Sequence, residues 1–274
     1  MTGLPTNTRS VDADPLQQFR VICRLMMKEF FRNRFAIFTM LLLPIFTLVI
    51  AFVATKDVPM LVALDSGEVV LVSMLEVHVV TATLTGIAIM TAMAGFYIMI
   101  SSTKRDRRLF LSGYRAIHIV GTKALICGVV LLAGSFLVYS LTVLFVTPKS
   151  HLIAYGAVLL VGLVYIFLGI LVGSLVPREF EGSLLVLLIS FIDTMLITNP
   201  MSSGTYRTLF SKTFPGYSPV QVMLEAAFTP PVSNLVFPTV GSLLYTLFLG
   251  IVALWIFWKK NKIARKVALR GYAW

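Results

Sequence analysis

Apolar residues divide the chain into long uniform stretches separated by short polar segments. A helical span of a bilayer needs about 20 apolar residues, and six stretches approach that length, at residues 36–54, 75–101, 119–146, 152–176, 183–199 and 236–258. Residues 37–54 and 154–176 are apolar on all sides, which indicates helices, because the strands of a membrane barrel would alternate with a period of two. The pattern predicts an all-α polytopic membrane protein with a six-helix transmembrane domain at residues 35–258.

A different periodicity precedes the first stretch. Between residues 16 and 34, apolar residues recur at intervals of three and four, while Arg20, Arg24, Lys28 and Arg32 form an i, i+4 row. This pattern predicts an amphipathic helix that lies flat on the inner leaflet, with its basic side chains extended to the lipid phosphates. Residues 1–15 are polar and are predicted to be a disordered leader, and the first span is predicted to remain uncleaved.

The connection after the fifth stretch is too long for a simple turn, since it extends from about residue 200 to residue 236. Within it, residues 220–228 resemble a helix that begins at Ser218 and Pro219 and stops at Pro230. We expect an external helical segment that lies in the outer interface or re-enters between the spans.

Composition and charge support a membrane protein and orient it. The chain is 58% hydrophobic and 13% charged, so most of its surface must be solvated by lipid. Its net charge of +11 is concentrated before the first span, at residues 104–115 and at residues 259–270, whereas residues 57–76 are mainly acidic. The positive-inside rule therefore places both termini in the cytoplasm, with residues 259–274 as a basic tail. Each basic cluster is equally consistent with anchoring to anionic lipid and with docking to a partner protein, but not with nucleic acid binding.

Catalytic and metal-binding patterns are absent from the sequence. The string that ends at Lys123 lacks the spacing of a phosphate-binding GxxxxGK[ST] loop, and His78, His118 and His151 have no second ligand at i+3 or i+4. Cys23 and Cys127 fall in different compartments of the predicted topology, so no structural disulfide is expected. We therefore expect no enzymatic activity, no metal and no cofactor in this chain.

One acid lies deep in the fifth stretch, and a glycine pair lies in the fourth. An ionisable group within a span is costly and is often functional, so Asp193 has two interpretations: a structural hydrogen bond to a neighbouring span, or a role with substrate or an ion. Gly169 and Gly173 form a small-xxx-small pair, which favours close helix packing.

Several of these segments, in this order, resemble the type-2 permeases of ABC transporters. The resemblance starts with the basic residues 28–34 followed by a leucine-rich span containing Pro44. It continues with the loop at residues 109–112 and with residues 119–123, which begin the third span. The connection after residues 168–176 and the outer motifs Asn199-Pro200, Ser203-Gly204, Phe214-Pro215 and Ser218-Pro219 are also similar. The chain departs from the family at residues 104–108, Lys-Arg-Asp-Arg-Arg, where many relatives are acidic and carry a proline. This departure suggests an acidic surface on the cognate ATPase.

The resemblance implies a transmembrane subunit of an exporter in a prokaryotic cell membrane, which moves lipophilic or amphipathic molecules outward. Two copies of a separate ABC ATPase would bind ATP and Mg, and a second or related permease would complete a dimer. Two short cytoplasmic coupling helices would contact the ATPase through Lys104, Arg105, Arg107, Arg108, Leu109, Tyr114, Arg115, Arg178, Glu179, Phe180 and Glu181. The substrate path would be lined by Met90, Met93, Phe96, Tyr97, Phe191, Asp193 and Thr194, although core packing is an ordinary alternative for each of these side chains.

A second class of function remains open from the sequence. An ion-coupled secondary transporter could use Asp193, but Pro44 has no clear counterpart in the fourth span, and such transporters usually carry interrupted helices in corresponding halves.

Overall fold

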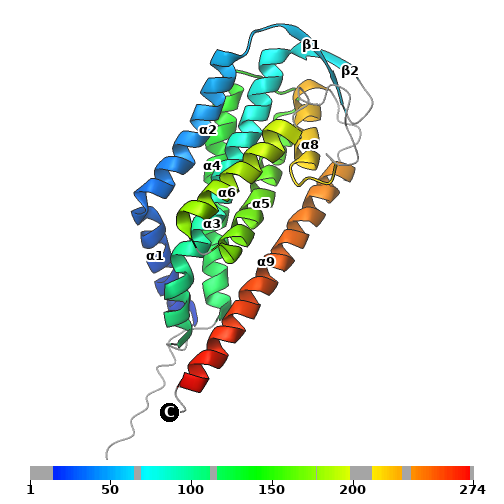
Figure 1. The fold of residues 1–274 in the computed structure, drawn as a ribbon. Coiled ribbons are helices and arrows are strands. Elements are labelled where there is room, and N and C mark those ends of the chain that lie inside the picture. Colours follow the sequence, from blue (N-terminus) through cyan, green and yellow to red (C-terminus); the bar gives the residue numbers. More distant parts are fainter. Residues whose placement is uncertain are drawn as a thin grey trace, which may run out of the picture.

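The chain forms an elongated, mostly helical bundle in the computed structural model, which describes residues 15–64, 69–111, 116–176, 178–197, 212–229 and 236–271 (Figure 1). The predicted leader at residues 1–15 lies outside this range except for Pro15, as do the outer motifs at residues 199–204. The helices are α1 (Pro15–Arg32), α2 (Arg34–Ala54), α3 (Met74–Leu111), α4 (Ala116–Val143), α5 (His151–Leu175), α6 (Glu179–Phe191), α8 (Tyr217–Phe228) and α9 (Val236–Gly271). A π-helical segment, η1 (Ile192–Ile197), continues α6.

Four of the described helices contain segments long and apolar enough to cross a membrane: Ile37–Ala54, Met74–Ser101, His118–Val143 and His151–Leu175. The apolar part of α9, Phe237–Ala253, is shorter, and α6 with η1 occupies the fifth predicted stretch. Large apolar side chains are exposed along α2, α4 and α9, for example Phe46, Phe136 and Phe248. A water-soluble surface does not carry apolar patches of this extent, so these faces meet lipid or another membrane helix.

Helix α3 is the centre of the bundle, since 94% of its apolar window is buried. It packs most extensively against α5 and α2. A Cβ atom at Gly169 of α5 would overlap the backbone of Ala92, and one at Gly95 of α3 would overlap the backbone of Ile166. The small residues therefore allow close contact between the backbones of α3 and α5, as expected from the pair Gly169 and Gly173.

The buried threonines of α3 show how this central helix tolerates polar residues. Thr81, Thr83, Thr85 and Thr91 donate hydrogen bonds of 2.7 to 2.9 Å to the carbonyl oxygens four residues earlier. The hydroxyl groups are thus satisfied within the helix, and their methyl groups are left to pack.

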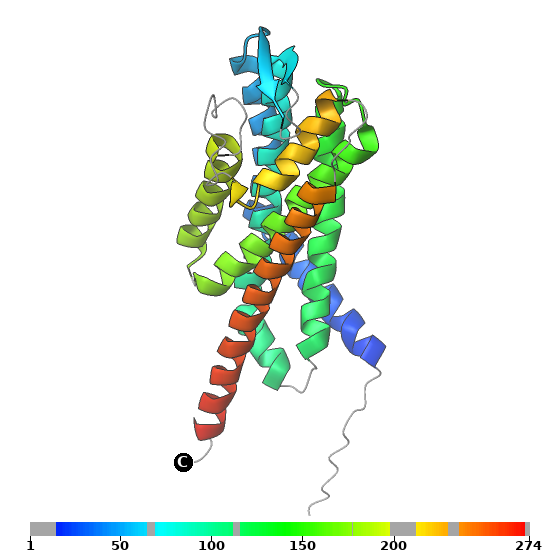
Figure 2. The ribbon, with the colours of Figure 1, turned by 90° about the vertical axis from the view of Figure 1, so that its right-hand side faces the viewer.

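The two ends of the bundle differ in character. At one end, here called the basic end, lie α1, the last turns of α3 and the end of α9 (Figures 1 and 2). Helix α1 is amphipathic as predicted, with Ile22, Met26 and Phe30 buried and its basic row exposed. It packs against α4, where the rings of Phe19 and His118 are 6.4 Å apart. The segment predicted as a basic tail continues α9 as a helix to Gly271.

The opposite end carries a β-hairpin that the sequence analysis did not predict. Strands β1 (Pro59–Ala63) and β2 (Val69–Ser73) pair antiparallel, with Leu61 opposite Leu71. On the other face of the hairpin, Val62 is buried. The two strands have five residues each, and only β2, with three valines, is rich in a residue that favours strands. Both are short compared with the spans that flank them.

Helix α8 lies inside this opposite end rather than on its surface. Every residue from Pro219 to Phe228 is buried, and the helix packs against α5 and α9. The loop between α4 and α5 closes its end, because the Lys149 ammonium donates a 2.5 Å hydrogen bond to the Phe228 carbonyl. The helix begins at Tyr217 after Gly216, so Ser218 and Pro219 occupy its first turn and not the predicted cap.

Candidate functional site at the basic end of the bundle

The first predicted coupling segment is the end of the central helix. Helix α3 continues without interruption from the membrane-spanning part to Leu111, so Lys104, Arg105 and Arg107 lie on it and do not form a separate short helix. Lysine, arginine and leucine are good helix formers, which allows the helix to extend beyond its apolar part. Arg108 is exposed, and Leu109 packs against the hydrophobic core, whereas Tyr114 and Arg115 lie outside the described residues.

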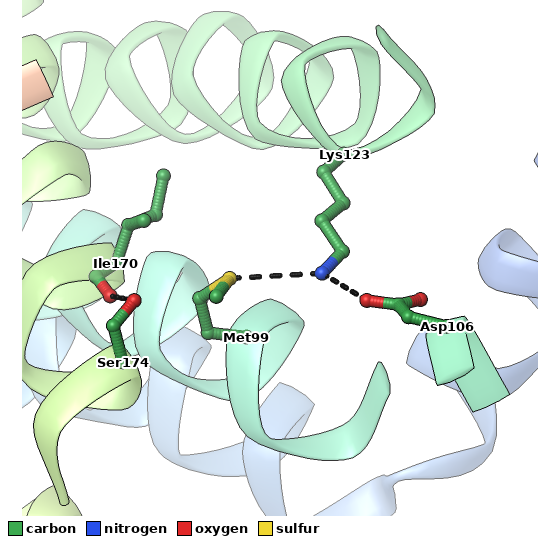
Figure 3. A network of polar contacts seen from close by, with 5 residues as sticks. All are labelled: Met99, Asp106, Lys123, Ile170 and Ser174. Atoms are coloured by element: carbon green, nitrogen blue, oxygen red, sulfur yellow. Dashed lines mark hydrogen bonds and ion pairs between the residues drawn. The ribbon is translucent and has the colours of Figure 1, made fainter. Parts of the chain in front are cut away.

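A buried ion pair fastens this segment to α4. The Lys123 ammonium of α4 donates to a carboxylate oxygen of Asp106 on α3, and the two side chains are 9% and 8% exposed (Figure 3). The same ammonium lies 3.6 Å from the sulfur of Met99, one to two turns earlier on α3. Lys123 therefore bridges two levels of the central helix.

The energetics of such a pair explain its structural effect. Each charge loses its hydration when buried, and only a close partner compensates for that loss. Removing one partner leaves an uncompensated buried charge, so the relative position of α3 and α4 at the basic end is strongly fixed.

The sequence analysis did not identify this pair, although a signal was present. Lys123 stands within an apolar stretch, where a charged residue requires a partner. Asp106 is the one acid between Glu76 and Glu179. The resemblance to the permease family placed Asp106 in the basic loop and Lys123 at the start of the third span, and it did not pair them.

The second predicted coupling segment forms the first turn of α6. Glu179 and Glu181 lie in that turn, where carboxylates interact favourably with the positive end of the helix dipole. Glu181 also accepts a 2.6 Å hydrogen bond from Arg178, a pair that is largely exposed. Phe180 is 80% exposed, which is unusual for a phenyl ring at the end of a helix. The segment is thus a helix start with a projecting aromatic side chain, not a separate coupling helix.

Most of the residues predicted to line a substrate path pack within a single copy of the chain. Met90, Met93, Phe96 and Tyr97 are each no more than 3% exposed. A Cβ atom on Gly134 of α4 would clash with the Met90 side chain, and one on Gly182 of α6 would clash with the Phe96 ring. These α3 side chains fill the spaces left by glycines on neighbouring helices. Phe191, in contrast, is 41% exposed on α6.

Asp193 joins three elements in the interior of the bundle. Its Oδ2 atom accepts a 2.5 Å hydrogen bond from the Tyr165 hydroxyl on α5 and a 3.0 Å bond from the Gly216 amide that precedes α8. The acid is 1% exposed and lies in η1, while Thr194 beside it bonds to the Ser190 carbonyl of its own helix. The partner hydroxyl comes from the fourth predicted span. The acid therefore makes a hydrogen bond to a neighbouring span, and a role for Asp193 with substrate or an ion stays a prediction.

Among the described residues, no group of three or more His, Cys, Asp or Glu side chains could hold a metal ion. The basic end carries exposed cations, such as Arg108, and the buried Asp106–Lys123 pair, and the Phe180 ring projects from the start of α6.

Comparison with known proteins identifies the family. The family model for ABC-2 family transporter proteins matches residues 76–259, about two thirds of the chain, from the start of α3 to the middle of α9. No curated protein matches the chain. The match agrees with the resemblance of the sequence to type-2 permeases and with the apolar helices of the fold. The chain belongs to the ABC-2 family of transporter proteins, as a multi-pass membrane subunit of an ABC transporter.

Proposed function

We propose that this chain is the membrane-spanning subunit of an ATP-driven exporter that moves a lipophilic or amphipathic molecule out of the cytoplasm or the inner leaflet. Two copies of a separate ABC ATPase would supply the energy, and two permease chains, identical or related, would form the transport path. In this account the basic end faces the cytoplasm and all six apolar stretches cross the membrane.

The continuity of α3 is the observation that carries this proposal. The residues expected to contact the ATPase, from Lys104 to Leu111, are the last turns of α3, whose apolar segment is the most buried of the four candidate spans. A force applied to these turns acts on the centre of the bundle without passing through a flexible loop, and such rigid-body displacement is how packed helices transmit motion. The Asp106–Lys123 pair extends the same displacement to α4.

The first turn of α6 gives the ATPase a second point of contact. Phe180 projects from this turn, and Phe191 lies on the exposed surface at the other end of the same helix. Motion of the first turn would therefore move a surface that borders the proposed path between two copies.

The exposed faces of α2 and α6 are the best supported walls of that path. Both are lined by large apolar side chains, including Phe38 and Phe46 on α2 and Leu188 and Phe191 on α6. Such walls favour apolar cargo. In this conformation Met90, Met93, Phe96 and Tyr97 lie behind these walls in the core.

Charge reversal at the end of α3 tests the proposal. The variant Arg107→Glu with Arg108→Glu is compared with Arg24→Glu with Lys28→Glu, which reverses two exposed charges on α1 at the same end of the bundle. Each protein is assembled with its ATPase in vesicles, and movement of a lipophilic fluorescent dye and of a fluorescent phospholipid is recorded with and without ATP.

We expect the α3 variant to insert normally and to hydrolyse ATP without transport, and the α1 variant to transport as the unmodified protein does. Loss of membrane insertion in the α3 variant would show that the segment is only a topology anchor. Transport that persists without ATP and collapses with the ion gradient would instead favour the secondary transporter.

A further inference from the structure

An apolar cavity of about 410 Å³ lies on a different side of the bundle from the proposed path. It is bordered by α3, α4, α5 and α9, and neither α2 nor α6 contributes to its lining. Helix α5 packs against both α4 and α9. It forms part of the floor of the cavity, where Phe167 is one of the lining side chains. Ala124, on α4, lines the cavity and is exposed, so the cavity opens on the outer surface of the bundle.

The lining residues on all four helices place this cavity at the same depth in the bundle. On α4 it extends from Val120 to Leu131, the half of the apolar segment nearest the basic end. On α5 it extends from Leu163 to Ile170, on α3 it includes Met99, and on α9 it reaches Ala253, all towards the basic ends of their apolar segments. The cavity is therefore at the level of one leaflet, which the proposed orientation makes the cytoplasmic one.

The lining defines the chemistry of an occupant. The lining is apolar apart from one charged side chain, Lys123, and that ammonium is paired with Asp106. A charged group in the cavity would lose its hydration without gaining a free partner. The occupant must therefore present hydrocarbon to this site.

The length of the site matches one hydrocarbon chain. From Val120 to Leu131, the α4 residues that line the cavity rise by about 17 Å at 1.5 Å per residue. A separate groove of about 490 Å³ shares the lining residues Leu131 and Leu163 and continues along α5 to Ile153, near the opposite end of that helix. One leaflet contributes about 15 Å of a hydrocarbon core that is about 30 Å thick.

We propose that this cavity, between α4 and α9, binds a single acyl chain of a phospholipid from the leaflet at the basic end. The site is formed by membrane-spanning helices, opens at the depth of the acyl chains and offers an apolar surface as long as one chain. The bound chain would fill the space between α4 and α9 and hold α9 against the bundle.

A lipid that can be cross-linked by light tests the site. The protein is reconstituted in nanodiscs that contain a phospholipid with a diazirine on its acyl chain, and labelled peptides are mapped by mass spectrometry. A second set of nanodiscs contains a fatty acid with a diazirine in place of the labelled phospholipid. The comparison distinguishes binding of a phospholipid chain from binding of a free fatty acid. No ATPase is present, so failure here would not bear on the proposed transport function.

Gly128→Leu is the informative variant, because a Cβ atom at Gly128 meets nothing within 4 Å and the new side chain would enter the cavity. The matched control is Ala133→Leu, an exposed position on the same helix that lines neither cavity. If Gly128→Leu fails to fold, Ala124→Leu at the opening provides the same test.

We expect the phospholipid to label peptides containing residues 120–131 and 163–170. We expect this labelling to fall roughly tenfold in Gly128→Leu, equivalent to ~1.4 kcal/mol of binding, and to persist in Ala133→Leu. Equal labelling in the two variants, or labelling by the fatty acid alone, would overturn the proposal.

Discussion

Two ion pairs in the bundle have similar partners but very different surroundings. The Asp106–Lys123 pair is buried between α3 and α4, whereas the Arg178–Glu181 pair is 75% and 56% exposed at the start of α6. Exposed pairs contribute little to stability, because water screens both charges. The buried pair fixes the geometry of two helices, because neither charge can be left alone.

Asp106→Asn should therefore destabilise the protein by about 3 to 5 kcal/mol, because the Lys123 charge loses its partner. Glu181→Gln should change the free energy of unfolding by no more than about 1 kcal/mol. Melting temperatures in nanodiscs compare the two variants. The double variant Asp106→Leu with Lys123→Met should recover most of the loss, since it removes both buried charges. A double variant as unstable as Asp106→Asn would contradict this account of the pair.

Asp193 acts on the fold through two hydrogen bonds to one carboxylate oxygen. Tyr165→Phe removes one donor and should cost about 1.5 to 3 kcal/mol, the usual contribution of a hydrogen bond to a charged group. Asp193→Leu removes the acceptor of both hydrogen bonds, so it should lower the free energy of unfolding by more than Tyr165→Phe does. Asp193→Asn keeps an acceptor oxygen and should lower it by less than Asp193→Leu. Melting temperatures and ATP-driven transport are measured on the same preparations. Loss of transport in Asp193→Asn without a change in melting temperature would assign this acid to the transport path.

At the scale of elements, the contact between α3 and α5 determines the shape of the bundle. Gly169 and Gly173 on α5 and Gly95 on α3 leave room for the backbone of the facing helix. Because lipid is as apolar as the side chains, membrane helices associate through such close packing rather than through the hydrophobic effect. The position of α3, and with it the proposed coupling segment, depends on these glycines.

Gly169→Ala tests this contact with a single added carbon. Its Cβ atom would overlap the Ala92 backbone, so the helices must separate, and overpacking of this kind costs about 1 to 3 kcal/mol or more. Gly156→Ala, on the same helix, is the control, because its Cβ atom meets nothing within 4 Å. We expect a lower melting temperature for Gly169→Ala and an unchanged or slightly higher one for Gly156→Ala. Equal effects of the two substitutions would contradict the proposed packing.

At the scale of the whole molecule, local patterns correctly predicted a mostly helical chain with apolar spans, and four of the described helices are long and apolar enough to cross a membrane. The amphipathic row of α1 and the uniform apolar stretches are properties of neighbouring residues, so they could be read without knowledge of the fold. The small-residue pair on α5 predicted its close packing for the same reason. The hairpin was missed because Val62 and Val70 belong to short runs inside a polar segment bordered by acids.

The features of the candidate site that were missed all depend on tertiary contacts. The charges at residues 104–108 indicated a loop, but the helix continues there because Asp106 turns inward to Lys123 and Leu109 packs on the core. The partner of Asp193 could not be chosen from the sequence, since Tyr165 and Gly216 are 28 and 23 residues away from it. Likewise, the burial of α8 follows from its contacts with α5 and α9.

The central claim is that the basic end of this bundle binds a partner ATPase through the last turns of α3. The most direct measurement is purification of the tagged chain from its native membrane, with the co-purified proteins and their ATPase activity recorded. We expect an ABC ATPase to accompany the unmodified protein and the Arg24→Glu, Lys28→Glu variant, and we expect less of it to accompany the variant Arg107→Glu with Arg108→Glu. Recovery of the chain without any ATPase, from membranes in which the chain is intact, would contradict it.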